Sequence, residues 1–187
     1  FHPRAAQCHA ERILIFILLF SSISSFSNEL KWAADAESGA PYVFNDPKLP
    51  GKYIGFEVEI IEVVAKKLNL EPKFIQNQWD GLIPGLERND YAVAINGLEI
   101  TPDRLEVVNF SNPYYITYLQ LVVRKDEDNI KSLSDLADKK AGTLKSSLAE
   151  RYLFDEGTID VRSYDSEVNS FEDLKNGRLD AVLTDAP

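Results

Sequence analysis

The sequence predicts an α/β protein built from two lobes, on three observations. Short apolar strands alternate with amphipathic helices along most of the chain. A polar, charged segment at residues 125–129 interrupts this alternation, which then restarts. Residues 86–93 and 174–182 both follow the order of helix end, polar turn and strand. Such alternation is typical of open, largely parallel sheets, which bind ligands at the carboxyl ends of their strands. Two lobes in one chain imply a cleft between them.

In the first half of the chain, apolar spacing predicts the helices. Ile61, Val64, Ala65 and Leu68 recur at helical spacing and predict one apolar stripe. A second helix is expected to begin at Asp80, a residue type that caps helix N-termini well. The strands of this half are expected at residues 30–34, 73–76, 91–95, 107–110 and 117–124.

The charged segment at residues 125–129 predicts the boundary between the lobes. Lobe 1 is therefore expected to span residues 28–122, and a partial lobe 2 residues 123–187. Val168, Phe171 and Leu174 recur at three-residue spacing and predict an amphipathic helix. The other elements of this half are expected at residues 133–137 and 147–154 for helices, and at 140–144, 161–164 and 181–183 for strands.

Residues 1–27 have the pattern of a secretory signal peptide. Arg4 and Arg12 precede a compact apolar block at residues 13–20, and a small-x-small cleavage sequence follows at residues 25–27. The apolar block is short for a membrane span, although an uncleaved anchor is the alternative. We therefore expect a periplasmic or extracellular protein.

The composition excludes several functions. The formal charge of the 187-residue chain is −10, which disfavours nucleic acid as a partner, because phosphate binding needs a basic surface. Cys8, His2 and His9 all lie in the expected leader, so the mature chain lacks cysteine and histidine. That excludes histidine-based triads, thiol nucleophiles and Cys/His zinc sites. Glycine-rich phosphate loops are absent as well. We expect no catalytic residues, metal or cofactor.

One arginine stands at a suitable place for binding a carboxylate. Gly97 ends an apolar strand, and Thr101 can then cap a short helix whose first residue is Pro102. Arg104 lies in the first turn of this helix, beside free backbone N–H groups. The alternative is that Arg104 only makes a local ion pair.

Five short motifs follow one another between about residue 30 and the end of the chain. They are GFEVE at residues 55–59, WDGLIP at 79–84, ITPDR at 100–104, FSNPYY at 110–115 and DAVLTDAP at 180–187. In their order and spacing they resemble the family 3 extracellular solute-binding proteins, the amino-acid receptors of bacterial ABC importers. The resemblance implies a two-lobed, type II periplasmic-binding-protein-like fold that closes around an amino acid. The second lobe is then incomplete, which suggests a fragment of a longer protein.

The resemblance also implies the residues that bind the ligand. Arg104 corresponds to the arginine that holds the α-carboxylate, and Asp185 to the carboxylate that holds the α-ammonium group. Both charges of a zwitterion need partners once they are buried. Trp79 corresponds to an aromatic residue of the cleft wall. The remaining implied ligand-binding residues are Asp35, Tyr42, Gly97, Leu98, Glu99, Ser147 and Leu148. Without the resemblance, core packing for Trp79 and a strand-end cap for Asp185 are the alternatives.

The chain departs from the family pattern at three places. Glu99 stands where the family usually has a small hydroxyl residue, and it either favours a cationic ligand or faces solvent. The loop at residues 37–40 lacks a frequent aromatic residue, and residues 144–148 replace a more glycine-rich helix start.

These features predict the function. We expect a monomeric binding protein that captures a polar or cationic amino acid for an ABC transporter, with the membrane permease as its partner. The alternatives are a ligand-sensing domain of a membrane receptor, or a small dehydratase-like enzyme on the same fold.

Overall fold

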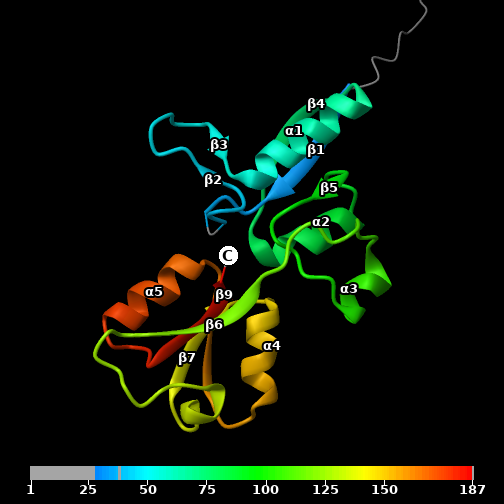
Figure 1. Ribbon diagram of the computed structural model, residues 1–187. Coiled ribbons are helices and arrows are strands. Elements are labelled where there is room, and N and C mark those ends of the chain that lie inside the picture. Colours follow the sequence, from blue (N-terminus) through cyan, green and yellow to red (C-terminus); the bar gives the residue numbers. More distant parts are fainter. Residues whose placement is uncertain (1–27, 38, 187) are drawn as a thin grey trace, which may run out of the picture.

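The computed structural model describes residues 28–37 and 39–186, which form two α/β lobes (Figure 1). The expected signal peptide at residues 1–27 lies outside the described residues. The chain passes from the first lobe to the second through residues 108–117, which form no helix or strand. None of the helices in the described part is long and apolar enough to cross a membrane.

The first lobe is built around a short parallel sheet. Its central strand β1 (Glu29–Ala34) pairs in parallel with β4 (Glu71–Gln76) and β5 (Val93–Ala94). Helix α1 (Phe56–Leu68) packs against this sheet, and its buried apolar residues join the same hydrophobic cluster as β1. The other elements are β2 (Phe44–Asn45), β3 (Tyr53–Ile54), the 3-10 turn η1 (Trp79–Gly81), α2 (Leu82–Glu87) and α3 (Pro102–Val107).

The second lobe holds a four-stranded sheet in the order β6-β9-β7-β8. Strand β7 (Lys140–Leu144) is parallel to β8 (Asp160–Tyr164) and to β9 (Ala181–Ala186). Helices α4 (Leu148–Asp155) and α5 (Glu167–Lys175) pack on this sheet (Figure 1). A 3-10 turn, η2 (Leu133–Leu136), precedes β7. The predicted largely parallel sheets are confirmed.

In the first lobe, β2 and β3 pair antiparallel as a separate two-stranded sheet. Strand β6 (Tyr118–Val123) is the antiparallel strand of the second sheet, and it bears on the lobe boundary. It pairs with β9 along its whole length, from Tyr118 opposite Ala186 to Val123 opposite Ala181. A boundary between residues 122 and 123 would divide this strand. We therefore propose a boundary before Tyr118, because the backbone hydrogen bonds of β6 tie it to the second sheet.

Two local predictions in the first lobe are wrong. Residues 107–110 form no strand: Val107 ends α3, and no partner strand pairs with this segment within the described residues. Asp80 does not cap a helix, because it lies inside η1 and Gly81 is the N-cap of α2. Its carboxylate instead binds Lys145 of the second lobe. The predicted strand at residues 91–95 is reduced to β5.

The buried stripe of α1 is rotated from the predicted one. Ile61 and Ala65 are buried as expected, but Val64 and Leu68 are exposed. Val58 takes part in the core instead, one turn before Ile61. Spacing alone does not distinguish neighbouring apolar stripes, and the sheet beneath α1 covers only one of them.

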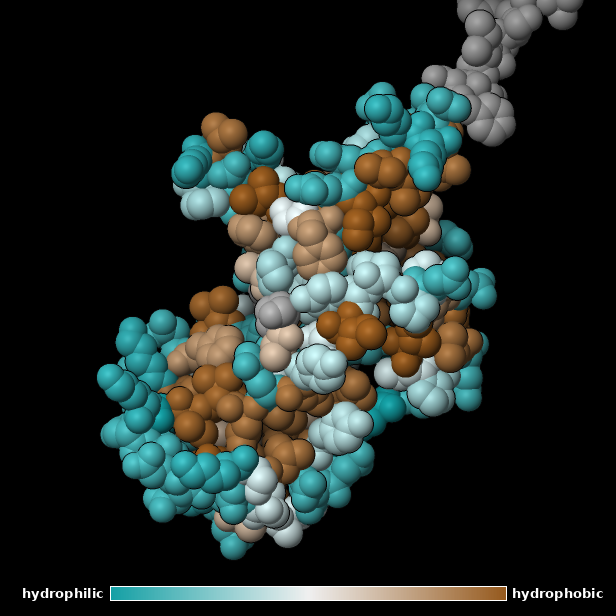
Figure 2. Space-filling model, viewed as in Figure 1, coloured by the Kyte–Doolittle hydropathy of each residue, from teal (hydrophilic) through white to brown (hydrophobic). Residues whose placement is uncertain are grey.

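Hydrophobic side chains remain exposed on both lobes, as the brown areas of Figure 2 show on the face viewed there. The most exposed large ones are Ile116 and Tyr118, which are 76% and 73% exposed. Two side chains of α5 that were expected to be buried, Val168 and Phe171, are 54% and 37% exposed. Leu174 is buried as predicted.

Candidate ligand-binding cleft

A cavity of about 240 Å³ lies between the two lobes. Lobe 1 lines it with Tyr42, Trp79 and Glu99, and lobe 2 lines it with Ser147 and Asp185. Five residues predicted from the sequence therefore meet in one cleft. They come from loops and strand ends that are far apart in the chain, as expected at the carboxyl ends of parallel strands.

A second cavity of about 350 Å³ adjoins the first and shares Tyr42, Glu99 and Asp185 with it. Its walls also include the other predicted residues Gly97, Leu98 and Leu148. Most of its remaining lining comes from residues 110–117, the segment that connects the lobes.

The predicted start of α3 is confirmed. The hydroxyl oxygen of Thr101 accepts a hydrogen bond from the Arg104 backbone N–H at 3.4 Å, and Pro102 is the first helical residue. This cap sets the position of Arg104 in the first turn of α3.

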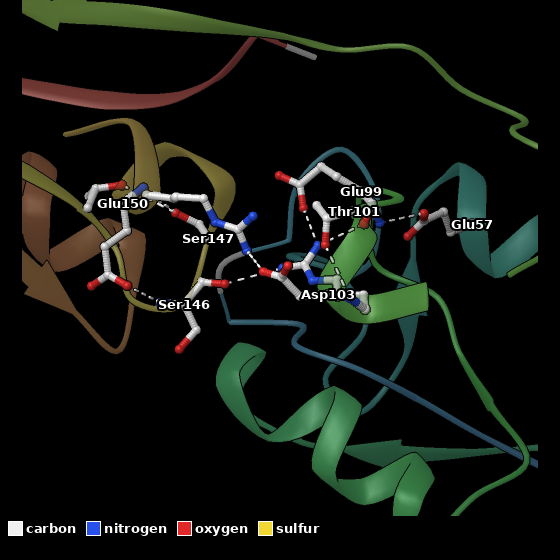
Figure 3. Close-up of polar contacts among 11 residues, drawn as sticks. Glu57, Glu99, Thr101, Asp103, Ser146, Ser147 and Glu150 are labelled. Atoms are coloured by element: carbon white, nitrogen blue, oxygen red, sulfur yellow. Dashed lines mark hydrogen bonds and ion pairs between the residues drawn. The ribbon is translucent and has the colours of Figure 1, made fainter. Parts of the chain in front are cut away.

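The guanidinium of Arg104 is held by Glu99. Its Nη1 donates to a carboxylate oxygen of Glu99 at 2.6 Å and to the Glu99 backbone carbonyl at 3.0 Å (Figure 3). Its Nη2 donates to the Ser146 carbonyl of lobe 2 at 3.2 Å. The guanidinium carbon also lies 5.5 Å from the ring centroid of Trp79. The local ion pair that the sequence left open is present.

Because of this pair, Arg104 does not line the cleft. It borders a separate pocket of about 200 Å³ together with Trp79 and Ser146. Glu99 lines the cleft itself and also binds Arg104. Arg104, which the resemblance assigns to the α-carboxylate of a ligand, thus lies behind Glu99 and outside the lining of the two cavities that contain Asp185.

The lobe 2 side of the cleft is acidic. Burial and the neighbouring carboxylates of Glu99 and Glu167 raise the pKa of Asp185 to about 6. Burial also raises the pKa of Glu167, which accepts a hydrogen bond from the Thr184 hydroxyl. Sequence reasoning missed Glu167, although it follows the carboxyl end of β8, and the strand-end rule used for the other candidates could have found it.

Tyr42 is the most deeply buried residue shared by both cavities. Its side chain is 6% exposed, and its hydroxyl finds no hydrogen-bond partner among the described residues. Burial and the charge of Asp185 raise the pKa of Tyr42 to about 12, so the phenol keeps its proton. A buried hydroxyl without a partner is costly, and a polar group of a ligand could supply one.

Gly97 is positioned by a buried carboxylate. Its φ of +64° favours glycine, and a Cβ there would lie 3.0 Å from the Tyr42 ring. Its N–H donates to Glu57 Oε1 at 2.8 Å, and the Tyr114 hydroxyl donates to the same oxygen. Glu57 therefore links the segment before α3 to the segment that connects the lobes. Burial raises the pKa of Glu57.

The other predicted residues have structural contacts as well. Ser147 is the N-cap of α4, and its Oγ accepts the Glu150 backbone N–H at 3.1 Å. Trp79 packs in a hydrophobic cluster with Leu82 while it also lines the cleft. Asp35 is different: it is buried, it lines neither cavity, and it accepts a hydrogen bond from Gln76 Nε2 at 3.1 Å.

Polar contacts hold the lobes together near Arg104. The carboxylate of Asp80 binds Lys145 Nζ at 2.8 Å, and Asp103 binds Arg151. Figure 3 shows Asp103 on the lobe 1 side, facing Ser146 and Ser147 of lobe 2. Within the described residues, no group of three or more His, Cys, Asp or Glu side chains could hold a metal ion.

The fold and the cleft together define a class of protein. Two α/β lobes share a small polar cleft, and the chain crosses between them, as in two-lobed type II ligand-binding proteins. The sequence profile of the bacterial extracellular solute-binding proteins, family 3, matches residues 30–173. The chain belongs to this family.

Curated relatives agree with this assignment. ABC transporter arginine-binding protein 1 of Escherichia coli K12 is 35% identical over 133 residues, which cover 71% of this chain and 54% of the relative. The L-cystine-binding protein TcyJ of the same organism is 37% identical over 137 residues, 72% of this chain and 52% of the relative. The chain thus spans about half the length of the curated relatives it matches.

Solved structures show the same fold. The arginine-bound form of truncated ArgBP from T. maritima superimposes with a TM-score of 0.81 at 33% identity, covering 85% of this chain and 74% of that one. An ancestral amino-acid-binding protein, AncCDT-1, described as a precursor of cyclohexadienyl dehydratase, superimposes with a TM-score of 0.79 at 30% identity over 84% of this chain and 70% of that one.

Proposed function

We propose that this protein binds an amino acid with a cationic side chain between its lobes, outside the cytoplasm, and delivers it to the permease of an ABC transporter. We further propose that it acts as a monomer. The names of the curated relatives support the transport role. The acidic lining of the cleft supports the choice of ligand.

The charge of the cleft is the observation that carries this proposal. Glu99, Glu167 and Asp185 all line it, and none of the described residues around it is Lys or Arg. Glu99 is already paired with Arg104 behind the cleft, so the surplus consists of the carboxylates of Asp185 and Glu167. A neutral amino acid carries no net charge and leaves this surplus in place. An amino acid with a cationic side chain brings a second positive charge, and opposite charges within a few ångströms favour the ionised carboxylates.

The size and the remaining lining fit a ligand of this kind. The cavity of about 240 Å³ is smaller than the roughly 300–1,000 Å³ of sites for drug-sized ligands. Trp79 and Tyr42 supply aromatic walls, on which a guanidinium or ammonium group binds favourably. The Tyr42 hydroxyl supplies a buried polar group without a partner of its own.

A thermal-shift screen of the purified protein against the amino acids tests the proposal, because a ligand that binds only the folded state raises its melting temperature. At 100 times its Kd such a ligand stabilises the fold by about 2.7 kcal/mol. For a chain of this size that corresponds to a shift of roughly 5–10 °C. We expect L-arginine or L-lysine to produce it and L-glutamate not to. The absence of a shift with every amino acid would contradict the proposal.

A dehydratase-like enzyme is the competing function, favoured by the buried Glu167. Burial raises its pKa, which is the direction of shift that a general acid needs. One structural neighbour is also described as the precursor of a dehydratase. We favour binding, because residues 28–187 contain no His or Cys. Turnover of candidate hydroxy acids by the purified protein, followed by NMR, would decide for the enzyme.

A further inference from the structure

Glu99 and Arg104 form the best sheltered ion pair of the cleft region. Their side chains are only 15% and 14% exposed, and a carboxylate oxygen lies 2.6 Å from Nη1. The Glu99 carbonyl and the Ser146 carbonyl take two further N–H groups of the same guanidinium. Arg104 therefore already has a carboxylate partner within its own chain.

Glu99 also stands between Arg104 and the cleft. It lines both cavities that contain Asp185, whereas Arg104 borders only the separate pocket behind it. A ligand in the cleft meets the carboxylate of Glu99 before it meets the guanidinium. Glu99 lies in the loop that precedes α3 (Figure 3).

We propose that Glu99 is an internal competitor for Arg104, which the α-carboxylate of the ligand must displace before it can bind. This inference rests on the proposed function. The exchange replaces one carboxylate by another, so the guanidinium keeps a charged partner throughout. The exchange has a free-energy cost in the cleft. The released carboxylate of Glu99 joins those of Asp185 and Glu167 there as an unpaired charge.

The exchange makes Glu99 a specificity determinant. Like charges that share a site disfavour ionisation, and unpaired carboxylates in a sheltered site are costly. A cationic side chain compensates the released carboxylate, and a neutral side chain of the same shape does not. The preference for cationic over neutral ligands thus has two sources. A cationic side chain is attracted to the carboxylates, and a neutral ligand leaves the carboxylate of Glu99 unpaired.

Calorimetric titration with L-arginine and L-citrulline tests this, since the two ligands differ mainly in the charge of the side-chain end. Wild type should prefer L-arginine. Glu99→Gln removes both the competitor and the charge, so L-citrulline should bind at least about fivefold tighter, since fivefold is the upper end for exposed ion pairs and this pair is more sheltered. The ratio of the two affinities should fall.

Glu99→Asp separates the two effects. The shorter side chain keeps the charge but loses reach toward Arg104, so both ligands should tighten by a similar factor and the preference for L-arginine should persist. Glu106→Gln is the matched control, because it removes an exposed charge from α3 outside the cleft. It should leave both Kd values within about twofold, as for most exposed sites.

The outcomes distinguish this inference from the proposed function. If wild type binds L-arginine but Glu99→Gln leaves the affinity for L-citrulline unchanged or weaker, Glu99 is not a competitor and the proposed function stands. An equal effect of Glu106→Gln would also overturn the inference, because the change would then be one of overall charge. If wild type binds no amino acid, both proposals fail together. Circular dichroism of each variant establishes that it is folded.

Discussion

The two lobes prepare their sides of the cleft differently. Lobe 1 presents a carboxylate that already has a partner, since Glu99 binds Arg104, and behind it Glu57 Oε1 accepts hydrogen bonds from Gly97 and Tyr114. Lobe 2 presents Asp185 and Glu167, whose pKa values burial raises. The difference indicates that the charged groups of lobe 1 are already positioned by contacts within the protein. The buried carboxylates of lobe 2 are the groups that a cation of the ligand can stabilise.

Removing the charge of Arg104 should have the largest effect on the lobe 1 side of the cleft. We expect Arg104→Ala to abolish the thermal shift by L-arginine. Binding should lose about 2–5 kcal/mol, because the α-carboxylate of the bound ligand has no cationic partner in this variant. Calorimetry measures the loss. Arg88→Ala is the control, because Arg88 makes an exposed ion pair with Asp90 away from the cleft. Retained binding in Arg104→Ala would refute the assignment of Arg104.

The pH dependence of ligand binding tests the role of Asp185 on the lobe 2 side of the cleft. Since the pKa of Asp185 is about 6, its carboxylate is protonated at lower pH and cannot pair with a cation. The affinity for L-arginine should therefore fall about tenfold per pH unit below 6 and level off above 7. Asp185→Asn should weaken binding at pH 7.5 by about tenfold to hundredfold and flatten this profile. A profile that is unchanged in Asp185→Asn would contradict the assignment.

The raised pKa of Asp185 makes the stability of the fold depend on pH in the opposite direction from ligand binding. The folded state binds the Asp185 proton more tightly than the unfolded state, whose value is near 3.8. The stabilisation from this proton is complete below pH 3.8 and is lost as the pH rises through about 6. Binding and folding thus depend on pH in opposite directions over this window.

Variants of Glu57 test how much the buried hydrogen bonds of this carboxylate contribute to the stability of lobe 1. Glu57→Ala should lower the free energy of unfolding by about 1–3 kcal/mol, because the Gly97 N–H and Tyr114 hydroxyl lose their acceptor. Glu57→Gln keeps an acceptor oxygen for these two donors without the charge, so it should cost less than Glu57→Ala. Urea unfolding measures both variants. Equal losses for the two would show that the charge itself is needed.

The contact between Lys145 and Asp80 should matter least. The pair joins the lobes at 2.8 Å, but its side chains are 48% and 29% exposed. We expect a coupling of less than about 1 kcal/mol in a double-mutant cycle on L-arginine binding. A larger coupling would mean that this contact, and not the ligand, determines how the lobes meet.

Much of the fold followed from local patterns. The cap of Thr101 and the first helical residue Pro102 were predictable, because each depends on residues within one helical turn. The strand at residues 117–124 was also predictable, but its partner β9 was not, because pairing across about sixty residues leaves no local signal.

The sequence by itself determined where Arg104 and Asp185 stand in their elements, since strand ends and helix starts are properties of short segments. Only the tertiary structure decided that the guanidinium of Arg104 also reaches the Ser146 carbonyl of lobe 2, that Glu167 joins Asp185, and that Asp35 lies outside the lining of the cleft. The physical reason is that charge pairing and burial depend on distances between segments. Those distances exist only after the two lobes have folded and met.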